Sequence, residues 1–423
     1  MKKIISLILS ISLIFSIYIL FFTCNTIQNS SFNSQKPSEK YTKSDSKKSD
    51  QNIKSQSKDL IQKKIDSMTL DEKIGQLVIS GVNSTSIDST IENLIKKRYI
   101  SGVILFNRNI SNAHQLLDLT NSLKNINKSN TIPLFISVDE EGGIVSRLPK
   151  EFVKLPKNNY IGKINNSNFS YNVGKSIGKE LSALGYNMDF APVIDINSNP
   201  KNPVIGSRAF GNNKEIVTKL GIKTMEGIQS ENIISVIKHF PGHGDTSVDS
   251  HIGLPIVNND LTRLNKLELF PFKSAIKNGA DVVMVSHILL PKIDSKYPAS
   301  LSNKITTDLL RKELNFKGVI ITDDMTMGAI TENYDIGNAA VKALLARSDI
   351  ILVCHDYNNV TTVLESLKTA IKNDTISEQR INQSLYRILS LKQKYKLNNT
   401  QITQLNISNI NSYIKNILNK FNN

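Results

Sequence analysis

Histidines, carboxylates and a lysine are concentrated in residues 238–251, which read KHFPGHGDTSVDSH. His239 and His243 lie four positions apart, as two zinc ligands on one helix do. The proline and glycine between them break a helix, so the two imidazole rings need not share a face. The chain has only two cysteines and no His-Glu-x-x-His pattern. Because spacing alone is weak support for a metal site, we expect neither a metal nor a cofactor.

Two adjacent carboxylates, Asp323 and Asp324, come directly after the apolar run 319–322. A carboxylate at the end of a strand is held rigidly, as a catalytic nucleophile requires. A glycosidase that retains configuration combines such a nucleophile with a proton donor to the leaving oxygen. Asp323 is therefore a candidate nucleophile.

The candidate proton donor that would act with Asp323 lies in the loop that carries Asp249 and His251, two positions apart. In extended backbone, residues at this spacing point to the same side. A carboxylate beside an imidazole orients the ring and stabilises its protonated form, and a histidine suits proton transfer near neutral pH. The alternative is that His251 only caps the loop, and the residues alone leave both open.

These groups require a scaffold, and from residue 59 onward short apolar runs alternate with amphipathic stretches. The runs are 76–79, 102–106, 134–138, 188–192, 234–239, 282–286, 319–322 and 350–353. The helical stretches between and after them include 90–97, 113–123, 171–184, 215–229, 264–277, 306–314, 360–372 and 377–395. Continuous apolar strands alternating with helices indicate a covered parallel sheet. Eight repeats predict a (β/α)8 TIM-type barrel; a doubly wound sheet lacks support because no Gly-rich turn follows the first strand.

Polar residues follow six consecutive strands of this pattern. They are Asp139, Asp195, Lys238 with His239, His287, Asp323 and His355. In a barrel, such positions converge on the face formed by the carboxyl ends of the strands, where barrel active sites lie. The sequence therefore predicts one site on that face.

Several segments between Met68 and Tyr395 resemble glycoside hydrolase family 3, specifically its bacterial β-N-acetylglucosaminidase branch. The segments are 68–77, 102–106, 138–143 with Arg147, 187–193, 208–211, 238–251 and 322–325. Two positions depart from the family pattern. Glu140 stands where glutamine is common, and we expect its charge near the mouth of the site. Residues 346–349 replace a smaller segment, which we interpret as structural.

The resemblance implies a role for each matching residue. Asp323 is the implied nucleophile, His251 the acid/base and Asp249 its partner. The implied sugar-binding residues are Asp139, Arg147, Arg208, Lys238 and His239. The Asp-x-His loop is what distinguishes this branch from the β-glucosidases of the family.

The activity that the resemblance implies is that of a retaining exo-β-N-acetylglucosaminidase, or β-N-acetylhexosaminidase. It would release terminal β-linked N-acetylglucosamine from peptidoglycan-derived or related glycans by double displacement. The alternatives are a family 3 β-glucosidase or xylosidase, an N-acetylglucosamine phosphorylase, and a non-catalytic wall-binding lipoprotein. The Asp249-Ser250-His251 loop opposes the glucosidase, and the presence of Asp323 with His251 opposes the non-catalytic protein.

Lys238 and His239 pose a geometric problem, because adjacent residues on a strand point to opposite faces. The resemblance has both side chains reaching one sugar, so the backbone must rotate one of them. A bulge or a non-prolyl cis peptide would do this. We predict an irregular peptide here, cis rather than a bulge, with both side chains in the pocket that holds Asp323.

The N-terminus predicts an address outside the cytoplasmic membrane. Lys2 and Lys3 precede the apolar run 4–22, and Cys24 follows it. This is typical of a signal peptide or membrane anchor, attached by a lipid on Cys24 or by an uncleaved helix, unless the protein is secreted. The predicted organisation is an anchor over 1–24, a Ser/Lys/Asn-rich disordered tether over 25–57, a single catalytic barrel over 58–397, and a C-terminal extension over 398–423 that packs as another helix or stays loose.

The charge of the chain does not indicate a nucleic-acid partner. It has 52 Lys+Arg against 37 Asp+Glu, a net charge of +15, but the lysines are scattered and no basic-aromatic motif appears. The expected partners are a glycan and, through the N-terminus, a membrane. We expect a monomer.

Overall fold

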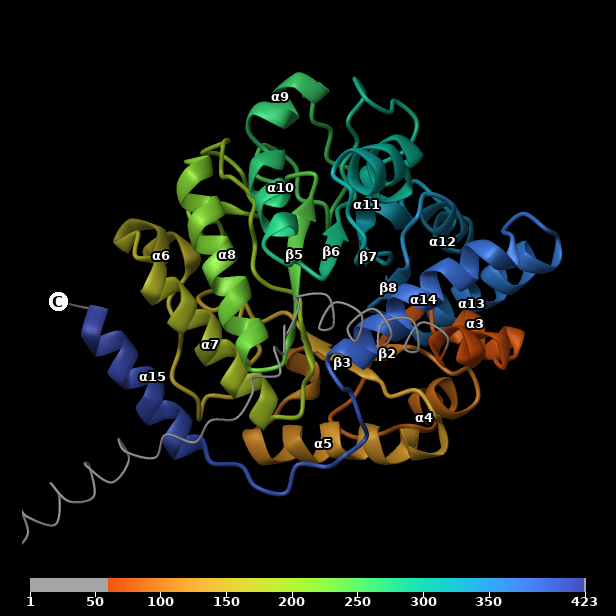
Figure 1. Ribbon diagram of the computed structural model, residues 1–423, viewed down its shortest axis with the longest axis horizontal. Helices are drawn as coiled ribbons and strands as arrows, with labels where there is room; N and C mark the ends of the chain where they lie inside the picture. Colours follow the sequence, from red (N-terminus) through yellow and green to blue (C-terminus); the bar gives the residue numbers. More distant parts are fainter. Residues whose placement is uncertain (1–59, 422–423) are drawn as a thin grey trace, which may run out of the picture. The chain divides into compact units, whose positions relative to one another are not determined.

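The computed structural model describes residues 60–421, in which eight parallel strands close into a barrel in chain order (Figure 1). The strands are β1 (Val78–Gly81), β2 (Gly102–Ile104), β3 (Phe135–Val138), β4 (Met188–Asp189), β5 (Ile234–Phe240), β6 (Val282–Val285), β7 (Val319–Asp324) and β8 (Ile350–Val353). The predicted (β/α)8 barrel is confirmed. Each predicted strand overlaps an observed one.

Helices surround the strands. They are α3 (Leu70–Gly75), α4 (Ser89–Lys96), α5 (Ala113–Ile126), α6 (Asn158–Ile164), α7 (Ser167–Ala183), α8 (Lys214–Ser230), α9 (Leu261–Lys266), α10 (Leu269–Lys277), the π-helix η5 (Asn303–Glu313), α11 (Gly328–Thr331), α12 (Ile336–Leu345), α13 (Tyr357–Lys372), α14 (Glu378–Lys394) and α15 (Ile407–Phe421). Many begin at a side chain that accepts a hydrogen bond from the first turn, for example Asp88, Asn112, Asn166, Asn213, Asp335 and Ser377. Such caps define where each helix starts after its loop.

One helical stretch differs from its prediction. Residues 264–277 contain the end of α9 and the whole of α10 instead of one continuous helix. Leu267 leaves the helical region of backbone space, with φ −130° and ψ −77°, and ends α9. Pro271 then falls in the first turn of α10, where a missing amide hydrogen is tolerated.

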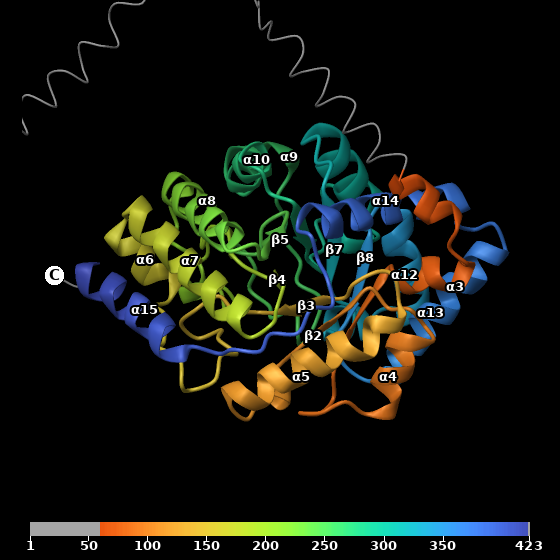
Figure 2. The same cartoon turned by 60° about the horizontal axis from the view of Figure 1, so that its bottom comes forward.

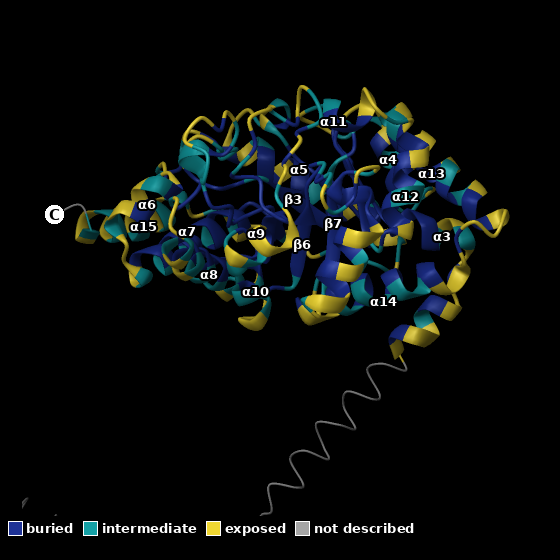
Figure 3. Cartoon of the chain, turned by 90° about the horizontal axis from the view of Figure 1, so that it is seen from above, coloured by how far each residue is buried: buried dark blue, intermediate teal, exposed yellow. Residues whose placement is uncertain are grey.

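The strands are buried on both faces, as their apolar composition predicts. Figure 3 shows the labelled central strands in the colour of buried residues, with exposed residues on the surrounding helices and loops. The exception is the end of β7, where Asp323 and Asp324 are only partly buried. The barrel therefore keeps its interior closed and opens at the carboxyl ends of its strands.

The C-terminal extension forms a helix that packs on the barrel's outer layer. In Figures 1 and 2, α15 lies beside α7. Ile414 is fully buried there, and the rings of Phe421 and Phe169 lie 4.8 Å apart between centroids. Of the two outcomes considered for this extension, the packed helix is found over Ile407–Phe421.

The predicted anchor, residues 1–24, and the predicted tether, residues 25–57, lie outside the described part of the chain. Within residues 60–421, no helix combines the length and the apolar content needed to cross a bilayer.

The segment before β8 is structural, as interpreted from the sequence. Asp349 is fully buried and its carboxylate accepts from Ser384 Oγ at 2.6 Å, from Arg387 Nη1 at 3.0 Å and from the amide of Ile320 at 2.9 Å. The guanidinium of Arg311 also contacts it. Burial alone would raise the pKa of Asp349, but the neighbouring arginines lower it. This one carboxylate thus connects β7, β8, η5 and α14.

Asp349→Ala should destabilise the barrel strongly. It leaves the buried guanidinium of Arg311 without its counter-charge, which costs about 3–5 kcal/mol. Urea unfolding followed by circular dichroism measures the loss. The matched control is Asp308→Ala, which removes an exposed partner of Lys312 and should change stability little. Equal midpoints for the two variants would contradict the structural role.

Candidate functional site

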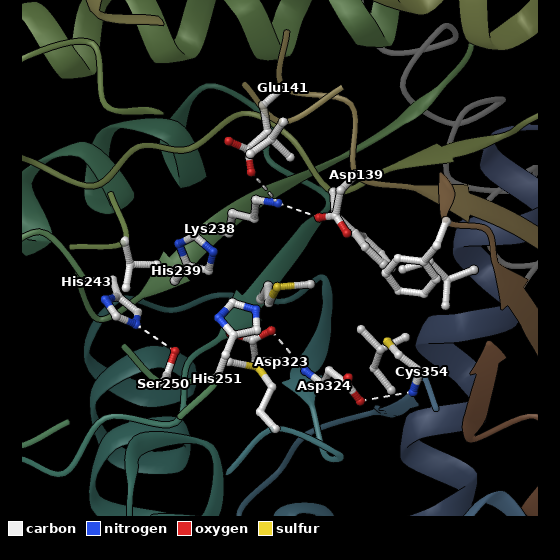
Figure 4. A pocket seen from close by; sticks show the side chains of 18 of the residues that line it. Asp139, Glu141, Lys238, His239, His243, Ser250, His251, Asp323, Asp324 and Cys354 are labelled. Carbon is white, nitrogen blue, oxygen red and sulfur yellow. Dashed lines mark hydrogen bonds and ion pairs between the residues drawn. The ribbon is translucent and has the colours of Figure 1, made fainter. Parts of the chain in front are cut away.

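A pocket of about 180 Å³ opens at the carboxyl ends of the strands (Figure 4). Seven of the eight predicted site residues line it: Asp139, Arg147, Arg208, Lys238, His239, His251 and Asp323. The eighth, Asp249, bonds to His251. The structure therefore brings the whole predicted set to one place.

A buried ion-pair cluster forms one wall of the pocket. Lys238 Nζ lies 2.6 Å from Asp139 Oδ1 and 2.8 Å from Glu141 Oε1. Arg208 donates to both oxygens of Glu141, from Nε at 2.9 Å and from Nη2 at 2.7 Å. Glu141 therefore joins two of the predicted sugar-binding cations. Sequence reasoning did not single it out, although the motif 138–143 contains it.

The charges in this cluster hold one another in their ionised forms. Burial alone would lower the pKa of Lys238, but Asp139 and Glu141 raise it above its usual value. Burial alone would raise the pKa of Glu141, but Lys238 and Arg208 bring it well below its usual range. The wall therefore presents a fixed pattern of charged groups near neutral pH.

The peptide between Lys238 and His239 is cis, as predicted. The pairing of β5 with β6 shifts register between Ile237 and Phe240, so the strand is irregular at this point. Both Lys238 and His239 line the pocket, and Figure 4 shows them on the same side of it as Asp139 and Glu141. The prediction that both side chains turn toward the pocket of Asp323 is confirmed.

His239 is oriented by a buried carboxylate. Its Nδ1 lies 2.7 Å from Asp195 Oδ2, and the same carboxylate accepts from the amide of His243 at 2.6 Å. Burial alone would raise the pKa of Asp195, but the charge of His239 and its hydrogen bond lower it. With Nδ1 committed to Asp195, Nε2 of His239 remains for a ligand. Asp195 was predicted as a strand-end polar residue, but not as a site residue.

Asp323 and Asp324 have different surroundings, although they are adjacent at the end of β7. Asp324 Oδ1 accepts from the amides of Thr326 and Cys354, both at 2.9 Å, which ties β7 to β8. Asp324 Oδ2 accepts from Thr326 Oγ1 at 2.6 Å, so both of its oxygens are bonded. Asp323 accepts from the amide of Asp324 at 2.9 Å, and both carboxylates line the pocket. Because Asp324 is held by these bonds, Asp323 is the carboxylate available for chemistry.

The charge state of Asp323 follows from its neighbours. Burial alone would raise its pKa, but His239 and His287, together with the amide of Asp324, lower it below the usual value for an aspartate. Asp323 is consequently ionised near neutral pH, as a nucleophile must be.

Asp249 and His251 form a hydrogen-bonded pair in the loop between β5 and α9. Asp249 Oδ1 lies 2.7 Å from His251 Nδ1 and also accepts from the His251 amide at 2.9 Å. The imidazole side chain is 65% exposed and lines the same pocket as Asp323, and Figure 4 labels both. Its Nε2 is thus free to exchange a proton with a ligand.

Two residues that the sequence placed at the site, Glu140 and His287, are buried outside the pocket lining. Glu140 does not lie at the mouth of the site: it is buried, lies outside the pocket lining, and accepts from the amides of Gly142 and Arg147. Burial raises its pKa to about 7. His287 is also buried, between Ser300 and the carbonyl of Asp324, and does not line the pocket.

No metal-binding group was predicted, and residues 60–421 contain no cluster of three or more His, Cys, Asp or Glu side chains placed to hold a metal ion. His239 and His243 have ring centroids 5.6 Å apart at an interplanar angle of 70°. His239 Nδ1 is bonded to Asp195, and the two ring nitrogens of His243 are bonded to Ser250 and Thr246.

A strand-end carboxylate that shares a barrel pocket with an Asp-held imidazole provides the groups of a retaining glycosidase. The model of the glycosyl hydrolase family 3 N-terminal domain matches residues 69–391. The chain belongs to this family.

Individual relatives agree with the family match. The beta-hexosaminidase A of Pseudoalteromonas piscicida is 35% identical over 73% of this chain, which spans 56% of that protein. The beta-hexosaminidase of Nitrosomonas eutropha is 32% identical over 80% of this chain and 98% of that protein. A solved family 3 β-N-acetylglucosaminidase from Paenibacillus sp. str. FPU-7 is 40% identical, with a TM-score of 0.79 over 84% of this chain and 69% of that one.

The Asp249–His251 pair generates a prediction for pH dependence. Burial alone would raise the pKa of Asp249, but its bonds to His251 lower it, so Asp249 is charged at neutral pH and supports a protonated imidazole. Asp249→Asn removes that charge, and the alkaline limb of kcat/KM for glycoside cleavage should move to lower pH, because an imidazolium without its counter-charge loses its proton more readily. Asp245→Asn, in the same loop but bonded to Asn259, is the control. An unmoved limb in Asp249→Asn would contradict the pairing.

Proposed function

We propose that the protein is a retaining exo-β-N-acetylglucosaminidase that releases terminal β-linked N-acetylglucosamine from peptidoglycan-derived or related glycans. The observation that carries the proposal is that an ionised strand-end carboxylate, Asp323, shares one pocket with the Asp249–His251 pair. The relatives named beta-hexosaminidase and β-N-acetylglucosaminidase support the choice of sugar.

In the proposed first step, Asp323 attacks the anomeric carbon while His251 donates its Nε2 proton to the departing glycosidic oxygen. A covalent glycosyl-enzyme forms and the aglycone leaves as an alcohol. In the second step, the neutral His251 takes a proton from water, whose oxygen attacks the anomeric carbon and frees Asp323. Two inversions give net retention. Asp249 stabilises the protonated form of His251, which is present before the first step and again after the second.

The binding roles proposed for Asp139, Arg147, Arg208, Lys238 and His239 rest on the polarity of the pocket wall. A carboxylate and cations fixed side by side suit the alternating donors and acceptors of sugar hydroxyls. Arg147 lines the pocket, where its guanidinium can reach a ligand. Lys238 can donate the one ammonium proton that Asp139 and Glu141 do not take.

We also propose that the enzyme acts as a monomer at the outer face of the cytoplasmic membrane or after secretion. The support for the location is the basic start of the chain, the apolar run 4–22 and Cys24. Cell fractionation and gel filtration test these two points.

Asp323→Asn should abolish turnover while sugar binding survives. The amide keeps the shape but cannot form the covalent bond, so kcat should fall by more than about a thousandfold, far beyond the loss of one hydrogen bond. The measurement compares a chromogenic N-acetylglucosaminide with the matching glucoside for both wild type and variant. Wild-type preference for the glucoside, or more than about a tenth of the rate in the variant, would contradict the proposal.

His251→Ala should slow substrates with poor leaving groups most. A general acid assists an alkyl or sugar oxygen that departs unaided only with difficulty, whereas an activated phenolate needs little help. The measurement is kcat/KM for a series of aryl and alkyl N-acetylglucosaminides. The same loss across the series would indicate that His251 only caps its loop.

A further inference from the structure

The loop that carries Asp249 and His251 is fixed to the barrel around the residue between them, Ser250. We call residues 241–253 the donor loop. The side chains of His251 and Asp249 are 65% and 31% exposed, whereas Ser250 is only 2% exposed although it lines the pocket beside His251. Figure 4 shows the Ser250 hydroxyl directed at His243.

The first attachment is a hydrogen bond between side chains. Ser250 Oγ lies 3.1 Å from His243 Nε2, and Thr246 Oγ1 lies 2.9 Å from His243 Nδ1. Burial lowers the pKa of His243 to about 4, so the ring is neutral and has one donor and one acceptor nitrogen. A hydroxyl can serve either nitrogen. The hydroxyls of Ser250 and Thr246 therefore supply the hydrogen bonds that both nitrogens of the buried His243 ring need.

The second attachment comes from α11, the short helix that follows the nucleophile strand. The amide of Gly328 donates to the carbonyl of His251 at 3.2 Å, and the amide of Ala329 donates to the carbonyl of Ser250 at 3.1 Å. A Cβ on Gly328 would lie 2.9 Å from the His251 oxygen and 2.8 Å from the Ile252 oxygen. Real Cβ contacts essentially never occur at such distances, so the loop approaches this closely only because residue 328 is glycine.

The segment between the nucleophile and α11 is itself held. Asp324 accepts from the amides of Thr326 and Met327, at its side chain and its carbonyl respectively. The position of Gly328 therefore follows the end of β7. The donor loop is therefore attached at two places. It continues directly from β5, and through α11 it is also fixed to the end of β7, the strand that carries Asp323.

We propose that Ser250 and Gly328 are positioning residues for the acid/base: Ser250 anchors the donor loop to His243, and Gly328 admits that loop against α11. The inference rests on the proposed role of His251. Ser250 lines the pocket, but its hydroxyl is bonded to His243; Gly328 is not part of the lining. Both residues act by fixing where the His251 imidazole stands relative to Asp323. Displacement of a catalytic group by about 1 Å can cost up to about a hundredfold in rate.

Ser250→Ala tests the first attachment. It should lower kcat about tenfold for an alkyl N-acetylglucosaminide, change KM little and spare an activated aryl substrate. Ser170→Ala is the control, because Ser170 is also buried with its hydroxyl bonded within α7 and α8 but lies remote from the pocket lining. An equal loss on both substrates, or the same pattern in Ser170→Ala, would overturn the proposal.

Gly328→Ala tests the second attachment. Alanine is favoured over glycine in a helix, so any loss must come from the crowded carbonyls of the donor loop. The control is Gly253→Ala, at the end of the same loop, where an added Cβ meets nothing within 4 Å. Gly328→Ala should show the leaving-group pattern of Ser250→Ala, and Gly253→Ala should match wild type. Wild-type kinetics in Gly328→Ala would overturn the role of this glycine.

A double-mutant cycle separates positioning from a direct role. In a His251→Ala background, Ser250→Ala should cause no further loss, because the group that it positions is gone. Additive losses would show that Ser250 acts independently of His251.

Hydrogen exchange gives a readout that does not depend on activity. Ser250→Ala should speed exchange in peptides covering 246–254 and 325–331, because the amides of Gly328 and Ala329 lose a stable partner. Unchanged exchange in a folded variant would overturn the attachment itself. If the wild type fails to cleave N-acetylglucosaminides, the proposed function falls, and exchange alone then decides whether the loop is held as described.

Discussion

The ammonium of Lys238 is buried in the wall of the pocket, and its neutralisation organises the surrounding loops. Removing an ion from water costs several kcal/mol unless partners of opposite charge replace the solvent. Asp139 and Glu141, just beyond β3, supply those partners, and Glu141 extends the cluster to Arg208. The ends of β3 and β5 and the loop after β4 are thereby fixed to one another before any ligand binds.

This cluster leaves the two reacting groups in contrasting settings. Asp323 stands at the end of a barrel strand, where histidines keep its pKa low. His251 stands on a loop, largely exposed, with Asp249 as its charge partner. A rigid nucleophile and a loop-borne proton carrier suit a reaction in which the carboxylate bonds to one carbon and then leaves it, while the proton carrier serves first an alcohol and then water. Separate supports also let each group keep its own protonation state.

The sequence predicted the barrel because buried parallel strands are continuous apolar runs with polar residues at their carboxyl ends. It also predicted the irregular Lys238-His239 peptide, since two adjacent side chains had to face one pocket. It did not identify Glu141 as a site residue, because the role of that carboxylate depends on its ion pairs with Lys238 and Arg208, which are distant in the chain. Ser250 was missed for the same reason: its hydrogen bond to His243 and its contact with α11 are tertiary features.

The error at Glu140 has a physical explanation. The loop after β3 turns sharply, and Gly142 and Gly143 both have positive φ, at 74° and 61°. This turn points Glu141 into the pocket wall and folds the amides of Gly142 and Arg147 onto Glu140. A charge that sequence order placed at the mouth is therefore buried behind the wall. Predicting it would have required the conformation of the turn, which residue types alone do not specify.

The most direct test of the account is to trap the covalent intermediate and locate it. The enzyme would be treated with a fluorinated N-acetylglucosaminyl donor that forms the glycosyl-enzyme faster than it is hydrolysed, digested, and mapped by mass spectrometry. The account predicts a single adduct, on Asp323, that is absent from the Asp323→Asn variant. An adduct on Asp139, Asp324 or any other residue, or turnover without an adduct, would contradict it.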